Sequence, residues 1–158
     1  NSEATSRRLP KEKAISIIAA TRKEIINEII LVGSNKEAAF VKEVYNALPD
    51  KTNITNQAGK TNLTELILLF NSSTTMLTTD SGPAHVANAL GTHTVVLFGA
   101  GNENNTAPYN KNNSTIIRLG QLNCEPCVSN SCKLYGVPQC LVRLDEQLIV
   151  SAVKNVLH

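Results

Sequence analysis

Basic surface charge and aromatic residues are both scarce in this sequence. None of its 158 residues is tryptophan, aromatic residues make up 4%, and 15 basic against 13 acidic residues leave a net charge of +2. Proteins that bind nucleic acid usually combine a basic patch with side chains that stack on bases. We therefore expect no nucleic-acid partner.

Long apolar segments are absent too. A membrane-spanning helix needs about 20 consecutive apolar residues, whereas the longest local runs here, such as Ile29 to Val32, have the length of a strand. The sequence starts NSEATSRRLP, without a methionine and without an apolar segment of the signal-peptide type. We expect this start to be a processed or engineered end and the chain to be part of something larger.

The rest of the composition is that of a globular domain. Hydrophobic residues make up 42% and charged residues 18%, which is typical of a soluble fold with its own core. A length of 158 residues fits one domain. We therefore predict a single domain over residues 1–158, within which residues 120–141 form a loop that contains four cysteines (the cysteine loop).

Short apolar runs alternate with amphipathic segments along the chain. The runs predict strands at residues 28–32, 53–56, 74–79, 95–98 and 115–119. Helical spacing predicts helices at residues 10–23, 36–48, 83–90 and 145–157, and one more after Asn62. Asn35, Asn62 and Asp145 are predicted helix caps, and the polar segment Gly99 to Asn113 is predicted to be a loop. The alternation predicts an α/β fold in which helices cover both faces of a parallel sheet.

Ligands of such sheets bind beyond the carboxyl ends of the strands. The segment TTDSGPAHVANALG, Thr78 to Gly91, lies at such an end and leads from a strand into a helix. A helix start presents unpaired N–H groups and the positive end of a dipole, both of which favour a phosphate. Gly82 clears the approach, Ser81 caps the helix or donates to a phosphate oxygen, and His85 lies within reach of the same anion.

A purely structural interpretation of this segment is also open. Asp80 and Ser81 are ordinary N-cap residues, and His85 is then a structural helix histidine. Asp80 holds the turn in that case, whereas in the other it binds a ligand hydroxyl. Spacing alone does not decide between a phosphate site and a helix cap.

The same segment resembles the signature of glycosyltransferase family 9, the bacterial heptosyltransferases of lipopolysaccharide core assembly. That signature is D-[ST]-G-x-x-H-x-x-x-A-x-x-x-P, followed by an apolar strand that ends in aromatic-Gly. The sequence matches it from Asp80 to Gly99, except that His93 replaces the proline. Three further segments resemble the family in order, namely RRLP at Arg7 to Pro10, with Leu9 for the usual Trp, LVGSNKEAAFVKEV at Leu31 to Val44, and AGKTNLTELILLFNSS at Ala58 to Ser73. Cys124 to Leu141 is similar to a cysteine-containing stretch of many members.

The resemblance implies one Rossmann-like half of a two-domain GT-B glycosyltransferase. These motifs belong to the C-terminal half, which binds a nucleotide-diphosphate sugar, with ADP-heptose as the expected donor. The N-terminal half binds the lipopolysaccharide core acceptor and provides the catalytic base, so no catalytic residue is expected in this chain. The implied reaction is inverting and metal-independent, without a cofactor. The implied location is the cytoplasm, at most peripherally at the inner face of the inner membrane.

The resemblance also implies roles for individual residues. Asp80, Ser81, Gly82 and His85 surround the donor diphosphate and sugar. Arg7 contacts the diphosphate, or Arg8 does if the register shifts by one, and the alternative is that both are solvated terminal charges. Glu37 binds the donor ribose, unless it is only a first-turn helix acid, while Gly33 and Ser34 let the donor approach the strand end.

Cys124, Cys127, Cys132 and Cys140 allow a structural zinc, a redox pair, a disulfide or free thiols. A cytoplasmic location favours reduced thiols, bound to zinc or free. Three other functions remain alternatives to the transferase: a non-catalytic nucleotide-binding module, a sugar-nucleotide epimerase of the same architecture, and a small zinc-stabilised interaction domain.

Overall fold

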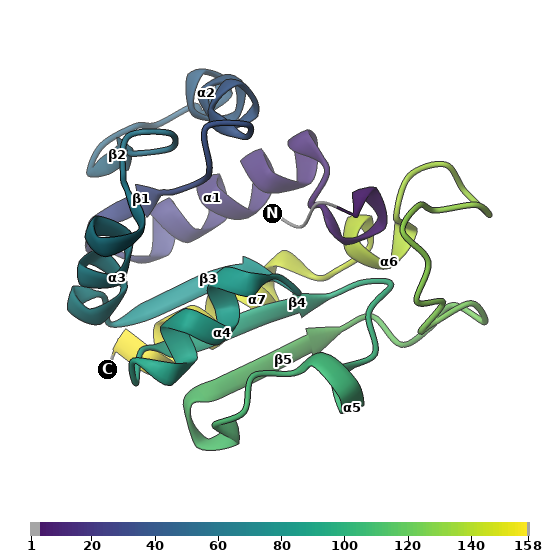
Figure 1. Cartoon of the computed structure of the whole chain (residues 1–158). Helices are drawn as coiled ribbons and strands as arrows, with labels where there is room; N and C mark the ends of the chain where they lie inside the picture. Colours follow the sequence, from purple (N-terminus) through teal and green to yellow (C-terminus); the bar gives the residue numbers. More distant parts are fainter. Residues whose placement is uncertain (1–3, 158) are drawn as a thin grey trace.

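Parallel strands alternate with helices in the computed structural model, which describes residues 4–157 (Figure 1). The strands are β1 (Ile29–Leu31), β2 (Ile54–Asn56), β3 (Thr75–Thr79), β4 (His93–Phe98) and β5 (Ser114–Arg118). The helices are α1 (Lys11–Glu24), α2 (Ala38–Ala47), α3 (Leu63–Ser72), α4 (Gly82–Ala89), α5 (Glu103–Thr106), α6 (Gln139–Val142) and α7 (Glu146–Leu157), with 3₁₀ turns η1 (Thr5–Arg7) and η2 (Lys111–Asn113). The strand pairings of the described residues are all parallel, which confirms the predicted α/β class.

The strands form two sheets, although the sequence predicted one. β1 pairs with β2, and β3, β4 and β5 form the second sheet in that order. Residues of β1 and β3 lie on opposite sides of a cleft of about 470 Å³. Ile18 of α1 and Phe70 of α3 also line this cleft. The smaller sheet is attached through helices instead, since α1 contacts both α2 and α7.

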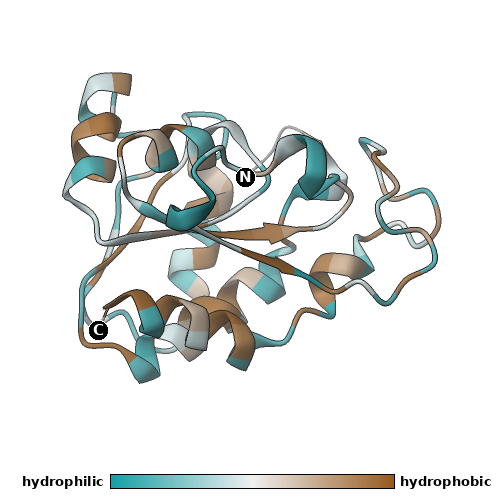
Figure 2. Cartoon of the chain, turned by 90° about the horizontal axis from the view of Figure 1, so that it is seen from below, coloured by the Kyte–Doolittle hydropathy of each residue, from teal (hydrophilic) through white to brown (hydrophobic). Residues whose placement is uncertain are grey.

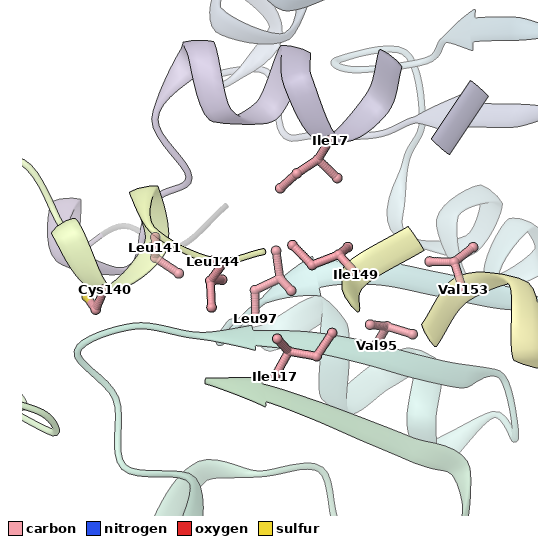
Figure 3. Close-up of a cluster of buried hydrophobic side chains, with 9 residues drawn as sticks. All are labelled: Ile17, Val95, Leu97, Ile117, Cys140, Leu141, Leu144, Ile149 and Val153. Atoms are coloured by element: carbon pink, nitrogen blue, oxygen red, sulfur yellow. The ribbon is translucent and has the colours of Figure 1, made fainter. Parts of the chain in front are cut away.

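The core lies on both faces of β4, whose residues from Thr94 to Phe98 are buried. Val95 and Leu97 pack with α1, α6 and α7 on one face (Figure 3). Val96 and Phe98 pack against Ala84 of α4 on the other. Figure 2 shows hydrophobic strands between layers of helices, and several of these helices combine hydrophobic and hydrophilic residues. Helices therefore cover both faces of this sheet, as predicted.

Two of the three predicted helix caps are confirmed. Asn62 accepts a hydrogen bond from the Glu65 N–H at 2.9 Å, and Glu65 accepts one from the Asn62 N–H at 2.8 Å, which is a complete capping box. Asp145 accepts a hydrogen bond from the Gln147 N–H at 2.8 Å. The prediction for Asn35 was wrong, because Ser34 to Glu37 form a turn and α2 begins only at Ala38.

The segment Gly99 to Asn113 is more ordered than the predicted loop. It contains α5 and η2. Both begin at an asparagine whose side chain accepts a backbone hydrogen bond: Asn102 from the Asn104 N–H at 3.1 Å, and Asn110 from the Asn112 N–H at 3.2 Å. Asparagine is a strong N-cap, so these polar residues start short helices as well as turns.

None of the helices within residues 4–157 combines the length and the apolar content needed to cross a bilayer.

Candidate functional site

Asp80 follows β3 directly and is 4% exposed. Its Oδ2 atom accepts a hydrogen bond from Thr106 Oγ1 at 3.3 Å and lies 3.5 Å from Arg7 Nη1. Gly101 packs so closely that a Cβ atom there would lie 2.1 Å from the same oxygen. Two segments far apart in sequence, η1 and the stretch from Gly101 to Thr106 that includes α5, therefore meet at one buried carboxylate at the carboxyl end of the sheet (Figure 1).

The start of α4 lies next to Asp80. Ser81 occupies the N-cap position, yet within the described residues its side chain caps no helix N–H, and its Oγ atom lies 3.2 Å from Thr78 Oγ1 instead. Pro83 is in the first turn, Gly82 has open space around its Cα, and His85 is exposed one turn into the helix. The capping role proposed for Ser81 is thus not seen here, and the helix start stays open to an anion.

Gly33, Ser34 and Glu37 form a second group, at the carboxyl end of β1. Glu37 Oε2 accepts hydrogen bonds from the Ser34 N–H at 2.9 Å and from Ser34 Oγ at 2.8 Å. Burial alone would raise the pKa of Glu37, but these hydrogen bonds act against it, and its pKa lies below the ordinary value. Glu37 is therefore ionised at neutral pH and can accept hydrogen bonds from hydroxyl groups.

The cleft between β1 and β3 connects the two groups. Its lining includes Gly33, Ser34 and Glu37 from the chain after β1, and Thr78, Thr79 and Pro83 from the end of β3 and the start of α4. Most of the remaining lining is apolar, with residues such as Leu9, Ile18, Phe40, Phe70 and Leu97. Asp80, Ser81, Gly82 and His85 are adjacent to this lining and are not part of it. An apolar cleft with a few polar groups is the usual form of a small-molecule site.

Sequence reasoning missed two partners of the Asp80 site. Thr106 lies in the segment that was predicted to be a loop. Arg118, at the end of β5, donates from Nε to Glu103 Oε2 at 2.8 Å and from Nη1 to the Gly99 carbonyl at 2.9 Å. The rule that ligands and their supports gather at the carboxyl ends of parallel strands already pointed to the end of β5, where Arg118 is the charged residue.

A sequence profile of glycosyltransferase family 9 (heptosyltransferase) matches residues 8–137, which is most of the chain. The chain belongs to glycosyltransferase family 9. The matched range includes Glu37 and the segment from Asp80 to His85, and it begins one residue after Arg7. The contact between Arg7 and Asp80 is therefore an observation of the structure, independent of the family match.

Two heptosyltransferases are similar to part of the chain in sequence. Lipooligosaccharide heptosyltransferase 2 of Haemophilus influenzae is 37% identical over 93 residues, which cover 58% of this chain and 27% of that protein. Lipopolysaccharide heptosyltransferase 2 of Salmonella typhimurium is 33% identical over 106 residues, which cover 64% of this chain and 30% of that protein. The chain spans less than half the length of either relative.

Solved structures of the family share the fold. The structure of E. coli ADP-heptose lps heptosyltransferase II matches 99% of this chain and 44% of its own, with a TM-score of 0.80 and 24% identity. A family 9 glycosyl transferase from Veillonella parvula matches the same shares with a TM-score of 0.77 and 21% identity. These similarities confirm that the described residues adopt the Rossmann-like fold of one half of a GT-B transferase.

The cysteine loop packs beside this site. Its backbone is tied to the chain after β4 by a hydrogen bond from the Val128 N–H to the Ala100 carbonyl at 2.8 Å. Cys127 is exposed and Cys140 is buried, and all four cysteines of the loop are free thiols. Burial raises the pKa of Cys140 to about 11, with smaller contributions from Glu125, Cys127 and Cys132. In residues 4–157, no three His, Cys, Asp or Glu side chains are arranged to hold a metal ion, so the arrangement gives the zinc interpretation no support.

Proposed function

We propose that this chain is the donor-binding domain of a glycosyltransferase that transfers heptose from a nucleotide-diphosphate donor, ADP-heptose, to a lipopolysaccharide core. The observation that supports this most strongly is the buried Asp80 in contact with Arg7 at the open start of α4, in a chain of family 9. The named relatives, which are heptosyltransferases, support the sugar and the acceptor.

The donor diphosphate binds at the start of α4 in this proposal. The first N–H groups of a helix and its dipole attract anions, and Gly82 leaves them accessible. Arg7 supplies a positive charge that Asp80 holds at this position, and His85 adds a donor from the first turn. Asp80 acts mainly by orienting Arg7 and by closing the turn.

The nucleoside binds in the cleft between β1 and β3. A volume of about 470 Å³ is within the range of ordinary ligand sites, roughly 300 to 1,000 Å³. The apolar side chains take the base, and the ionised Glu37 accepts hydrogen bonds from the ribose hydroxyls. Adenine is the base that the family resemblance implies.

The transfer step needs a second region. An acceptor hydroxyl attacks the anomeric carbon from the side opposite the diphosphate, and its proton passes to a base outside these 158 residues. The bond between the anomeric carbon and the diphosphate oxygen breaks, and its electron pair stays on the diphosphate. The helix N–H groups and Arg7 stabilise the charge that develops there, without help from a metal, and the configuration inverts. The isolated chain therefore binds the donor without turning it over.

Calorimetry with the 158-residue chain tests this proposal. We expect ADP to bind more tightly than UDP and GDP, and Asp80→Asn to weaken ADP binding while the exposed Asp50→Asn does not. Arg7→Gln and Arg8→Gln form a matched pair, because the two arginines are adjacent in sequence and Arg7 Nη1 lies 3.5 Å from Asp80 Oδ2. Equal affinities of the Arg7→Gln and Arg8→Gln variants for ADP contradict the role of Arg7. A parent chain that binds none of the three nucleotides contradicts the proposed function.

A further inference from the structure

Within residues 4–157, Arg118 forms more side-chain hydrogen bonds than the other cations near the site, and it is not one of the residues that line the cleft. Its side chain is 13% exposed. Nε and Nη2 approach Glu103 Oε2 at 2.8 and 2.6 Å, and Nη1 lies 3.4 Å from Glu125 Oε2, a carboxylate whose side chain is 4% exposed. Its guanidinium also lies 5.7 Å from the ring centre of Phe98. A side chain with this many partners has one position.

Two of its hydrogen bonds fix the segment Gly99 to Gly101. Nη1 donates to the Gly99 carbonyl at 2.9 Å and Nη2 donates to the Gly101 carbonyl. Because the C=O and N–H of a trans peptide point in opposite directions, the N–H groups of Ala100 and Asn102 are turned away from Arg118. The guanidinium of Arg118 therefore sets the orientation of this segment from the side opposite to these N–H groups.

The same segment forms the surface on which Asp80 rests. A Cβ on Gly101 would overlap Asp80 Oδ2, so the position of Gly101 limits where that carboxylate can lie. Glu103, which Arg118 also holds, begins the helix α5 whose Thr106 donates to Asp80. Of the three described neighbours of Asp80 Oδ2, Arg7, Gly101 and Thr106, Arg118 thus positions the last two, through bonds to other groups.

Arg118 joins these contacts to the cysteine loop as well. Glu125, its buried partner, accepts hydrogen bonds from the Gly120 N–H at 3.0 Å and the Leu122 N–H at 3.3 Å. These bonds close the turn at the start of the loop. One cation therefore neutralises two acids that belong to two different segments, α5 and the cysteine loop.

The geometry points to Arg118 as a positioning residue for the diphosphate site: it holds the segment Gly99 to Gly101 and α5 against Asp80. This role rests on the proposed function, since the diphosphate is the ligand that Asp80 and its neighbours are assigned. Arg118 itself does not contact the donor.

Arg118→Lys is the variant that tests this role. It keeps the charge, but the three N–H groups of a lysine ammonium cannot replace the planar fork that bonds two carbonyls, Glu103 and Glu125. Arg143→Lys is the matched control, since Arg143 is exposed and its Nε donates to Gln139 Oε1 of the same helical turn at 3.4 Å. ADP and adenosine binding are measured by calorimetry, and amide hydrogen exchange of residues 99–106 is measured without ligand. Glu103→Gln, on a side chain that is 33% exposed, serves if Arg118→Lys does not fold.

We expect Arg118→Lys to exchange faster at residues 99–106 and to bind ADP about tenfold more weakly, which corresponds to about 1.4 kcal/mol, with adenosine binding unchanged. The Arg143→Lys variant should match the parent in amide hydrogen exchange, in ADP binding and in adenosine binding. Unchanged exchange and unchanged ADP binding overturn the role of Arg118 and leave the proposed function in place. An equal loss for ADP and adenosine also overturns it, because a general structural defect has that effect. A parent chain that binds neither ligand overturns the proposed function, and the role of Arg118 falls with it.

Discussion

Replacing Gly101 by alanine places a methyl group 2.1 Å from Asp80 Oδ2 and 3.1 Å from Asp80 Cγ. Close carbon–oxygen contacts in proteins are normally no shorter than about 3.3 Å, so the overlap is about 1.2 Å. Gly101 is not among the glycines with a positive φ, and alanine fits its backbone without strain. The whole effect of the substitution therefore comes from the collision with Asp80.

The expected loss in the free energy of unfolding follows from this collision. Inserting a methyl group into a packed site costs about 1–3 kcal/mol, and moving the Asp80 carboxylate away from Thr106 costs about 1 kcal/mol more. In an Asp80→Ala background the space is free. There, Gly101→Ala should be neutral or stabilise by about 0.4–1 kcal/mol, because alanine restricts the unfolded chain. The two substitutions should thus couple by about 3 kcal/mol.

Urea unfolding of the parent, both single variants and the double variant measures this coupling as differences in the free energy of unfolding. The coupling should appear as a shift in the urea concentration at the midpoint of unfolding, while the dependence of the free energy of unfolding on urea concentration stays unchanged. A cost of Gly101→Ala that is the same with and without the Asp80 side chain would refute the close contact on which the site geometry depends.

Three further predictions concern stability and thiol chemistry. Thr79→Val should raise the free energy of unfolding by about 1 kcal/mol, because the buried Thr79 hydroxyl has no partner within residues 4–157; a loss in a urea melt contradicts this. The hydrogen bond from Lys13 lowers the pKa of Glu146 below 4.5, so this pair stabilises the fold above that pH and the contribution is lost as the pH falls through the lowered value. In the Glu146→Gln variant, the free energy of unfolding should accordingly fall less between about pH 6 and pH 3 than in the parent. If the free energies of the two proteins fall in parallel with pH, the effect is disproved. Iodoacetamide should label Cys127 first and Cys140 last, because Cys140 is buried with a pKa of about 11; mass spectrometry of the peptides gives the order.

Local signals in the sequence predicted the helices and strands well. The capping box of Asn62 and Glu65 and the apolar run of β4 each lie within a few residues, where periodicity and capping rules apply. The division into two sheets was not predictable in this way. Periodicity states which residues are buried, but it does not state which strand edges pair, and β1 and β3 lie on opposite sides of a cleft.

The candidate site, too, was predictable from the sequence only where its signals are local. The turn after β3 was found from its residues alone, since the acid, the glycine and the proline have local reasons to stand there. Arg7 lies 73 residues from Asp80 in sequence, and only the family resemblance proposed a shared role for the two, which stays a prediction. Thr106 and Arg118 have no local pattern of their own, because their partners come from other segments.

The anchoring of η1 also has a consequence for the order in which the molecule is completed during synthesis. Ser6, beside Arg7, donates from its hydroxyl to the Ser129 carbonyl, 123 positions later, and from its N–H to the Asn130 carbonyl at 3.3 Å. The sheet of β3, β4 and β5 is made from residues 75–118 and can pair as soon as these have emerged. Arg7 is made before the strands of this sheet, yet the backbone that fixes its neighbour is made after them. A nascent chain that ends before residue 129 therefore has a formed sheet and an arginine without this anchor, and the Asp80 site is assembled only after residues 129 and 130 have been made.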